Sequence, residues 1–168
     1  LREASNAAKL SAEEEGFKSL VIARVNNYVN VRDIPSEDGE IVGKLYDKSV
    51  GTFIEESDGW YKISSGSVEG YVKAEFCVTG DDAVSYAREV GTRIATVTTT
   101  TLYVREEPGT DAVILGMVPI EDELIVTEEL DGWVKVNIEE GDGYVSTDFV
   151  NMSTEFVKAE SIEEERAR

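Results

Sequence analysis

The chain contains one sequence pattern twice, in a single register and without a gap. Each residue of the second copy lies 73 positions after its counterpart in the first. An unbroken register over this length indicates a tandem duplication of one small domain, so we expect two similar units rather than one larger fold. The matched pairs include Arg32 and Arg105, Pro35 and Pro108, Trp60 and Trp133, and Tyr71 and Tyr144.

Within each copy, short runs of alternating apolar and polar residues are separated by turn residues. Val21, Ala23 and Val25 alternate with other residues, and Pro35 and Gly39 lie in the first loop. Five or six such runs at a spacing of about 8–12 residues predict a small all-β barrel or sandwich. We assign residues 20–79 to the first unit and residues 94–151 to the second.

Three segments outside the copies are predicted to be helical. Residues 1–19 form a leader, either a short helix or a frayed segment. Residues 80–93 have acidic residues at the start and glycine near the end, which predicts a short helical linker. Its apolar side indicates that it packs and fixes the pair of domains. Residues 152–168 have too few apolar residues to pack alone, so we expect the start of a polar helical linker.

The two copies differ in side-chain volume on one predicted strand. The first has Gly51 and Phe53 where the second has Leu124 and Val126. A small–large pair exchanged for two medium residues would conserve core volume. We therefore expect this strand face to point inward.

The composition is strongly acidic, with a formal net charge of −19. This opposes binding to nucleic acid or to anionic membranes, both of which need clustered cations. The excess is concentrated in the second copy, which favours a cationic partner there, such as a peptide with free amines; the alternative is a solvated acidic surface. No apolar run approaches the roughly 18 residues of a membrane span. The chain begins at Leu1 without an apolar signal segment, and we expect it to be a piece of a longer protein.

The sequence offers few groups for catalysis. It has no histidine and one cysteine, which excludes Ser-His-Asp and Cys-His arrangements and thiolate metal clusters. We expect no catalysis by this chain, no cofactor and no metal, although calcium in the acidic loop at residues 139–142 is an alternative. Cys77 has a valine counterpart, Val150, so we expect a buried structural thiol.

Binding is therefore the favoured role, and aromatic side chains are the candidates for ligand contact. The alternative for the two tryptophans is a core position that seals each barrel. We expect Arg32 and Arg105, just before the proline loops, to hold those loops by hydrogen bonds to carbonyl groups. The candidate binding residues are Tyr28, Trp60, Tyr71, Tyr103, Trp133 and Tyr144.

Four motifs, repeated in order, resemble the bacterial SH3 domain family. This resemblance implies two small SH3-like β-barrels. The sequence departs from the usual pattern of the family at Tyr71 and Tyr144, where the family often has tryptophan. It also departs at Tyr103, which stands in the second copy where the first has Asn30. The motifs in the first copy are Asn30-Val31-Arg32-Asp33-Ile34-Pro35, Ile41-Val42-Gly43, Asp58-Gly59-Trp60-Tyr61 and Glu69-Gly70-Tyr71-Val72.

The resemblance also implies a function. The family usually serves as a non-catalytic targeting module on secreted cell-wall hydrolases and binds peptidoglycan stem or bridge peptides. Tandem copies often precede an NlpC/p60-type cysteine peptidase domain, so a catalytic domain in the same parent chain is an expected partner. We expect an extracellular, cell-wall-associated protein. The alternative is a structural or regulatory platform that docks on a catalytic domain and shapes its cleft; a proline-peptide binder is less favoured.

Overall fold

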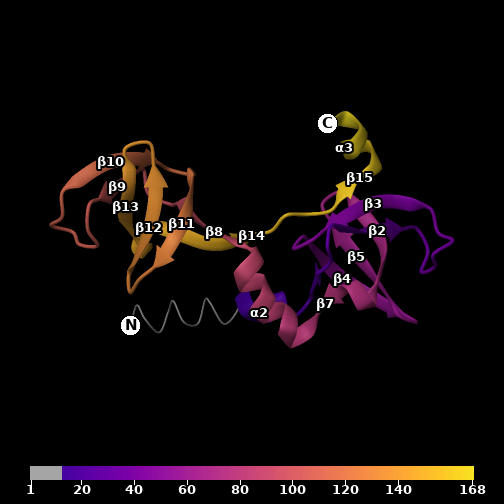
Figure 1. The fold of residues 1–168 in the computed structure, drawn as a ribbon. Coiled ribbons are helices and arrows are strands. Elements are labelled where there is room, and N and C mark those ends of the chain that lie inside the picture. The colour runs from indigo at the N-terminus through magenta and orange to yellow at the C-terminus, as the bar shows by residue number, and fades with distance from the viewer. Residues whose placement is uncertain (1–12) are drawn as a thin grey trace. The chain divides into compact units, whose positions relative to one another are not determined.

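The computed structural model describes residues 13–168 (Figure 1). They form two compact units, one made of residues 13–91 and 156–168 and the other of Thr92–Glu155. Most of the predicted leader, residues 1–12, lies outside the described residues, and residues 13–17 are helical. None of the described helices is long and apolar enough to cross a membrane. Each unit is built on an antiparallel sheet, which confirms the predicted all-β class.

The first unit is an eight-stranded sheet in the order β15-β3-β2-β6-β5-β4-β1-β7. Inward-facing residues such as Val31, Leu45, Ile63 and Val72 are fully buried in one core cluster, which makes the unit a small barrel. Burying each such side chain stabilises the fold by about 1.5–3 kcal/mol. The strands are β1 (Leu20–Ala23), β2 (Tyr28–Arg32), β3 (Ile41–Tyr46), β4 (Val50–Ser57), β5 (Trp60–Ser65), β6 (Val68–Lys73), β7 (Cys77–Val78) and β15 (Glu160–Ser161).

The second unit repeats this arrangement with seven strands in the order β10-β9-β13-β12-β11-β8-β14. Its pairing order matches that of the first unit strand for strand, except that β15 has no counterpart. A 3-10 turn precedes the last matched strand in both units, η1 (Ala74–Phe76) and η2 (Thr147–Phe149). The strands are β8 (Thr92–Val97), β9 (Thr101–Arg105), β10 (Ile114–Pro119), β11 (Glu123–Glu129), β12 (Trp133–Ile138), β13 (Gly141–Ser146) and β14 (Val150–Glu155).

The segment between the copies is the helix α2 (Gly80–Val90). Its buried residues, Ala83, Tyr86 and Ala87, pack with Phe17 in a second apolar cluster of the first unit. The predicted helix therefore exists and packs by an apolar side, as expected. It is a part of the first unit rather than a free connection.

The C-terminal segment differs from the sequence-based expectation of a polar linker. Residues 152–155 belong to β14, and residues 156–168, which we call the C-terminal strap, pack on the first unit (Figure 1). The strap begins with Phe156, whose ring meets that of Phe17 edge to face at 5.6 Å. It then adds β15 to the edge of β3 and ends in the helix α3 (Ile162–Ala167). The sheet edge supplies the partners that the segment's polar sequence could not indicate.

One small side chain, Ala159, anchors the strap in the core of the first barrel. Ala159 is only 5% exposed and belongs to the main core cluster. Its backbone N–H donates to the hydroxyl of Ser65 over 2.8 Å, and that hydroxyl donates to the carbonyl of Val50 over 2.6 Å. In the second unit Ile138 stands in place of Ser65 and packs against its own core. The smaller residue therefore leaves room, and a hydroxyl, for the strap.

We predict that Ala159→Asp lowers the free energy of unfolding of the first unit by about 2–3 kcal/mol, because it places a charge without a partner in the core. Hydrogen exchange of the 168-residue chain measures each unit separately. The matched control is Val157→Asp, since Val157 lies on the same strap but is 66% exposed. Equal protection of the first unit in both variants would show that the strap is not held through Ala159.

The expected exchange of core volume involves a different pair of residues. Phe53 is partly exposed and packs edge-on against Tyr61, so it does not fill the space at Gly51. That space is filled by Ile63, whose Cδ1 would lie 2.7 Å from a Cβ added at Gly51. The exchange is therefore Gly51 with Ile63 in one copy for Leu124 with Val136 in the other. The cause is the cross-strand contact between β4 and β5, which a single strand does not reveal.

Exchanging these residues one at a time tests the cross-strand pair. We expect Gly51→Leu to destabilise the chain by about 1–3 kcal/mol through overpacking, and Ile63→Val by about 0.5–1.5 kcal/mol. The double variant reproduces the pair in the second copy, so it should be more stable than Gly51→Leu alone. Urea unfolding of all four chains gives the coupling energy. If the two changes in the free energy of unfolding were strictly additive, residues 51 and 63 would not form the proposed cross-strand pair.

Candidate functional site

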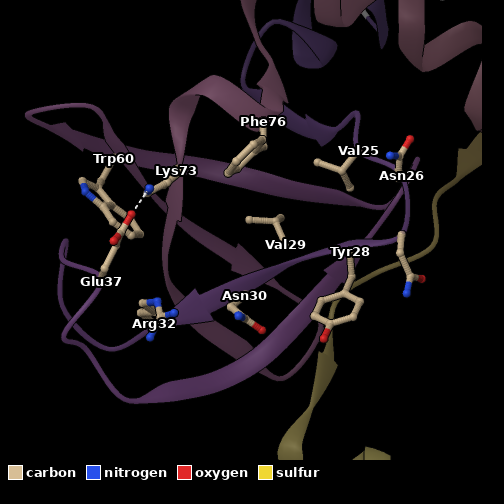
Figure 2. Close-up of a pocket in the computed structure, with 11 residues that line it drawn as sticks. Val25, Asn26, Tyr28, Val29, Asn30, Arg32, Glu37, Trp60, Lys73 and Phe76 are labelled. Carbon is tan, nitrogen blue, oxygen red and sulfur yellow. Dashed lines mark hydrogen bonds and ion pairs between the residues drawn. The ribbon is translucent and has the colours of Figure 1, made fainter.

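A pocket of about 540 Å³ opens on the first barrel, where the β1–β2 turn, the β2–β3 loop and the end of β6 come together (Figure 2). Aromatic side chains line it from three elements: Tyr28 on β2, Trp60 at the start of β5 and Phe76 in η1. Arg32, Glu37, Lys73 and three asparagines supply the polar groups. Such a mixture of apolar walls and a few polar groups is typical of a binding site.

Strand alternation explains why these side chains face the pocket. On β2, Val29 and Val31 are buried, so Tyr28, Asn30 and Arg32, which alternate with them, point the other way. Trp60 follows a tight turn in which Gly59 has a φ of 85°, a conformation that favours glycine. The same periodicity that forms the core therefore forms the pocket wall.

The pocket contains an ion pair between Lys73 and Glu37, drawn as a dashed line in Figure 2. The hydrogen bond from Lys73 lowers the pKa of the Glu37 carboxyl and raises the pKa of the Lys73 ammonium. The Lys73 Nζ also lies 6.0 Å from the centroid of the Trp60 ring and 3.8 Å from a carboxylate oxygen of Glu75. Both members are charged at neutral pH.

A guanidinium group holds the loop beside the pocket in each unit. The Arg32 Nη1 donates to the carbonyl of Gly39 over 2.8 Å, and the Arg105 Nη1 donates to the carbonyl of Ala112 over 2.8 Å. Both bonds bridge seven residues and connect matched positions. This confirms the predicted role of the two arginines as loop ties.

The second barrel has a pocket of about 160 Å³ in the equivalent place. All nine of its lining residues occupy positions that match lining residues of the first pocket. The two pockets therefore occupy matched surfaces of the two units. The pairs are Asn26 and Thr99, Tyr28 and Thr101, Val29 and Leu102, Asn30 and Tyr103, Arg32 and Arg105, Glu37 and Thr110, Trp60 and Trp133, Lys73 and Ser146, and Phe76 and Phe149.

The pockets share a frame and differ at its polar rim. Tryptophan, phenylalanine and the loop-tying arginine are the same in both. Tyr103 replaces the smaller Asn30 and takes up space, which fits the smaller volume of the second pocket. The guanidinium of Arg105 stacks 5.7 Å from the centroid of that ring. Ser146 replaces Lys73, so the second pocket has no ion pair of this kind.

The bacterial SH3 domain family matches two regions of the chain, residues 27–77 and 100–151. The chain belongs to this family. One match lies in each barrel, and the two contain Trp60, Trp133 and most of the other lining residues of each pocket. The sequence resemblance is thereby confirmed: these are tandem bacterial SH3 domains.

The individual relatives are distant. The putative N-acetylmuramoyl-L-alanine amidase YrvJ of Bacillus subtilis (strain 168) is 26% identical over 132 residues, which is 75% of this chain and 26% of that protein. The chain thus spans about a quarter of the length of this curated relative. The solved structures of NlpC2 and NlpC1 from Trichomonas vaginalis are each 14% identical, with a TM-score of 0.34. The alignments cover 79% of this chain and 47% and 45% of those chains.

The structure divides the six predicted aromatic residues into two groups. Tyr28 and Trp60 line the first pocket, and Tyr103 and Trp133 line the second. Tyr71 and Tyr144 line neither pocket. The hydroxyl of Tyr71 instead donates to the carboxylate of Glu55 over 3.1 Å on the outer face of the sheet.

Sequence reasoning missed several lining residues of these SH3 pockets. Phe76 and Phe149 are both exposed at the end of a 3-10 turn. Their signal was present, since an aromatic residue stands at this matched position in both copies. Lys73 and Glu37 gave no such signal, because their counterparts, Ser146 and Thr110, are uncharged. The carboxylates of the second SH3 domain also lie outside its pocket lining, so its acidity does not describe that pocket.

Cys77 on β7 is the single thiol of these SH3 domains. It packs against the core of the first barrel, and burial raises the pKa of the thiol to about 12. A thiol with that pKa is protonated at neutral pH and is a poor nucleophile. Within residues 13–168, no group of three or more histidine, cysteine or acidic side chains is placed to hold a metal ion.

The burial of Cys77 predicts that its thiol reacts slowly while the chain is folded. At pH 8, Cys77 of the folded chain should react with a disulfide reagent at least about 100-fold more slowly than in 8 M urea, where its pKa returns to its ordinary value of about 8.5. Absorbance of the released thiolate measures both rates. A rate for the folded chain close to that in urea would show that the thiol is accessible and ionised.

Proposed function

We propose that this chain is a non-catalytic cell-wall binding module whose two SH3 domains each bind a peptidoglycan peptide in the pocket described above. The coincidence of the two pockets carries the proposal. They keep the same tryptophan, phenylalanine and arginine although most of the surrounding surface has diverged. Retention of an aromatic frame at a solvent-accessible site is expected for ligand contact rather than for core packing.

The comparisons support this class of ligand. A relative of the tandem domains is named a putative N-acetylmuramoyl-L-alanine amidase, a name that describes an amide between a sugar acid and an amino acid. Because the chain spans about a quarter of that protein, we assign the hydrolysis to other parts of such proteins and the binding to this part. An extracellular, cell-wall-associated location follows from the same proposal.

A polymeric wall offers many copies of a peptide, so two weak sites on one chain gain affinity together. We predict that the double variant Trp60→Ala, Trp133→Ala loses at least about 10-fold in retention on purified peptidoglycan compared with the original chain, and that either single variant loses less. Co-sedimentation measures retention. Since both tryptophans are half-buried, Phe76→Ala combined with Phe149→Ala tests the same pockets through more exposed side chains.

Tyr144→Ala is the matched control, because Tyr144 lies on the second barrel but outside its pocket. We expect it to keep full retention. Suppose instead that Tyr144→Ala loses retention while the folded double phenylalanine variant keeps it. The binding surface would then lie on the outer face of the sheet rather than in the pockets. Absence of retention in the unaltered, folded chain would contradict the proposed function itself.

A second candidate function is a platform that docks on a catalytic domain. The observation in its favour is a set of exposed apolar side chains on the second barrel, among them Val113 and Met117, which are 63% and 62% exposed. Neither residue lines the pocket. A folded chain that is not retained on peptidoglycan but binds a purified cell-wall peptidase domain would support the platform.

A further inference from the structure

The first pocket already contains a carboxylate, and it belongs to the protein itself. Glu37 lies on the loop between β2 and β3, and its carboxylate reaches Lys73 at the end of β6 (Figure 2). The Glu37 side chain is 67% exposed, whereas that of Lys73 is 30% exposed. The ammonium is therefore part of the pocket wall, and the carboxylate approaches it from the solvent side.

This ion pair can be exchanged at low cost. Ion pairs at the surface contribute only about 0–1 kcal/mol, because water solvates both partners well when they separate. A carboxylate from a ligand could therefore replace that of Glu37 at Lys73. It would lie near the Trp60 ring, which is 6.0 Å from the Lys73 Nζ, and would also be attracted by Arg32, whose charge acts on Glu37.

The second pocket offers a built-in comparison. It has the same apolar walls, Trp133 and Phe149, and the same arginine, Arg105. At the positions of Lys73 and Glu37 it has Ser146 and Thr110, which carry no charge. The two pockets thus differ in the ammonium group rather than in the aromatic frame. A ligand that needs a cation at the position of Lys73 should therefore bind the first pocket more tightly than the second.

We propose that the first pocket selects ligands that carry a free carboxylate beside a small apolar group, such as the C-terminus of a short peptide. Lys73 determines this specificity, Glu37 competes with the ligand for it, and the second pocket does not make the distinction. The inference rests on the proposed function, since it specifies which end of a wall peptide the first pocket recognises.

The chain has two tryptophans, one in each pocket, so each pocket has its own reporter. We would titrate the ¹⁵N-labelled 168-residue chain with N-acetyl-D-alanyl-D-alanine and with the C-terminal carboxamide of that peptide, and follow the two indole N–H signals by NMR. At the Trp60 signal we expect the carboxylate peptide to bind about 2-fold more tightly than the carboxamide, because its carboxylate replaces that of Glu37 at Lys73 and only part of a charge pair is gained. At the Trp133 signal we expect equal affinities.

Two substitutions taken from the second pocket should act in opposite directions. Lys73→Ser should remove the preference for the carboxylate at the Trp60 signal. Glu37→Thr should strengthen binding of the carboxylate peptide there by about 2- to 5-fold, because it removes the competitor and leaves the ammonium. Neither should change the affinity for the carboxamide. The converse variant, Ser146→Lys, should create the preference at the Trp133 signal.

Three results would overturn the inference. The first is equal affinity for both peptides at the Trp60 signal, and the second is a change of affinity for the carboxylate peptide in the same direction in Lys73→Ser and Glu37→Thr. The third is no response of the Trp60 signal to either peptide when the peptide concentration is 10 times the highest protein concentration. Retention on peptidoglycan, measured separately, keeps the two proposals apart. If one of these NMR results is obtained but the chain is still retained, the selection of a carboxylate is wrong and binding to the cell wall stands. If the unaltered chain is not retained, the proposed function fails.

Discussion

Closing a small hydrophobic core is the constraint on which both units depend. A unit of about 60 residues buries few apolar side chains, so each position at the open end of its sheet matters. The second barrel closes with its own Ile138. The first has Ser65 there and is completed by Ala159, which arrives from beyond the second barrel in the sequence. This difference in side-chain size distinguishes the barrel that carries the C-terminal strap from the one that does not.

The pockets show how a duplicated scaffold diverges. Core residues follow strand alternation and the arginines hold the loops beside the pockets, so a change at either would disturb the fold as well as the pocket. The rim residues lie at strand ends and in loops, where a lysine can become a serine without affecting the core. Lys73 and Ser146 are the clearest example. Divergence at such positions changes the charge of the pocket rim while the barrel stays the same.

The sequence was informative wherever structure arises locally. Alternation and the fixed offset predicted two β-rich units, and matched arginines predicted the loop ties. It was uninformative about contacts between distant segments. Ala159 is buried because it meets Ser65, 94 residues away, and its polar surroundings in the sequence indicate solvent instead. The pocket linings were predictable in part: four of the six candidate aromatic residues line a pocket, and their role in binding stays a prediction. The Lys73–Glu37 pair was not predictable, because it depends on a loop meeting a strand end.

The strap also bears on the order in which the protein is made. Synthesis proceeds from the N-terminus, and domains generally fold as units while they emerge from the ribosome. Here the first barrel lacks its final core residue until Ala159 has been added, after the whole of the second barrel. Of these two barrels, the one that emerges first is therefore the second to reach its mature form, and a nascent chain that stops within the second barrel leaves both unfinished.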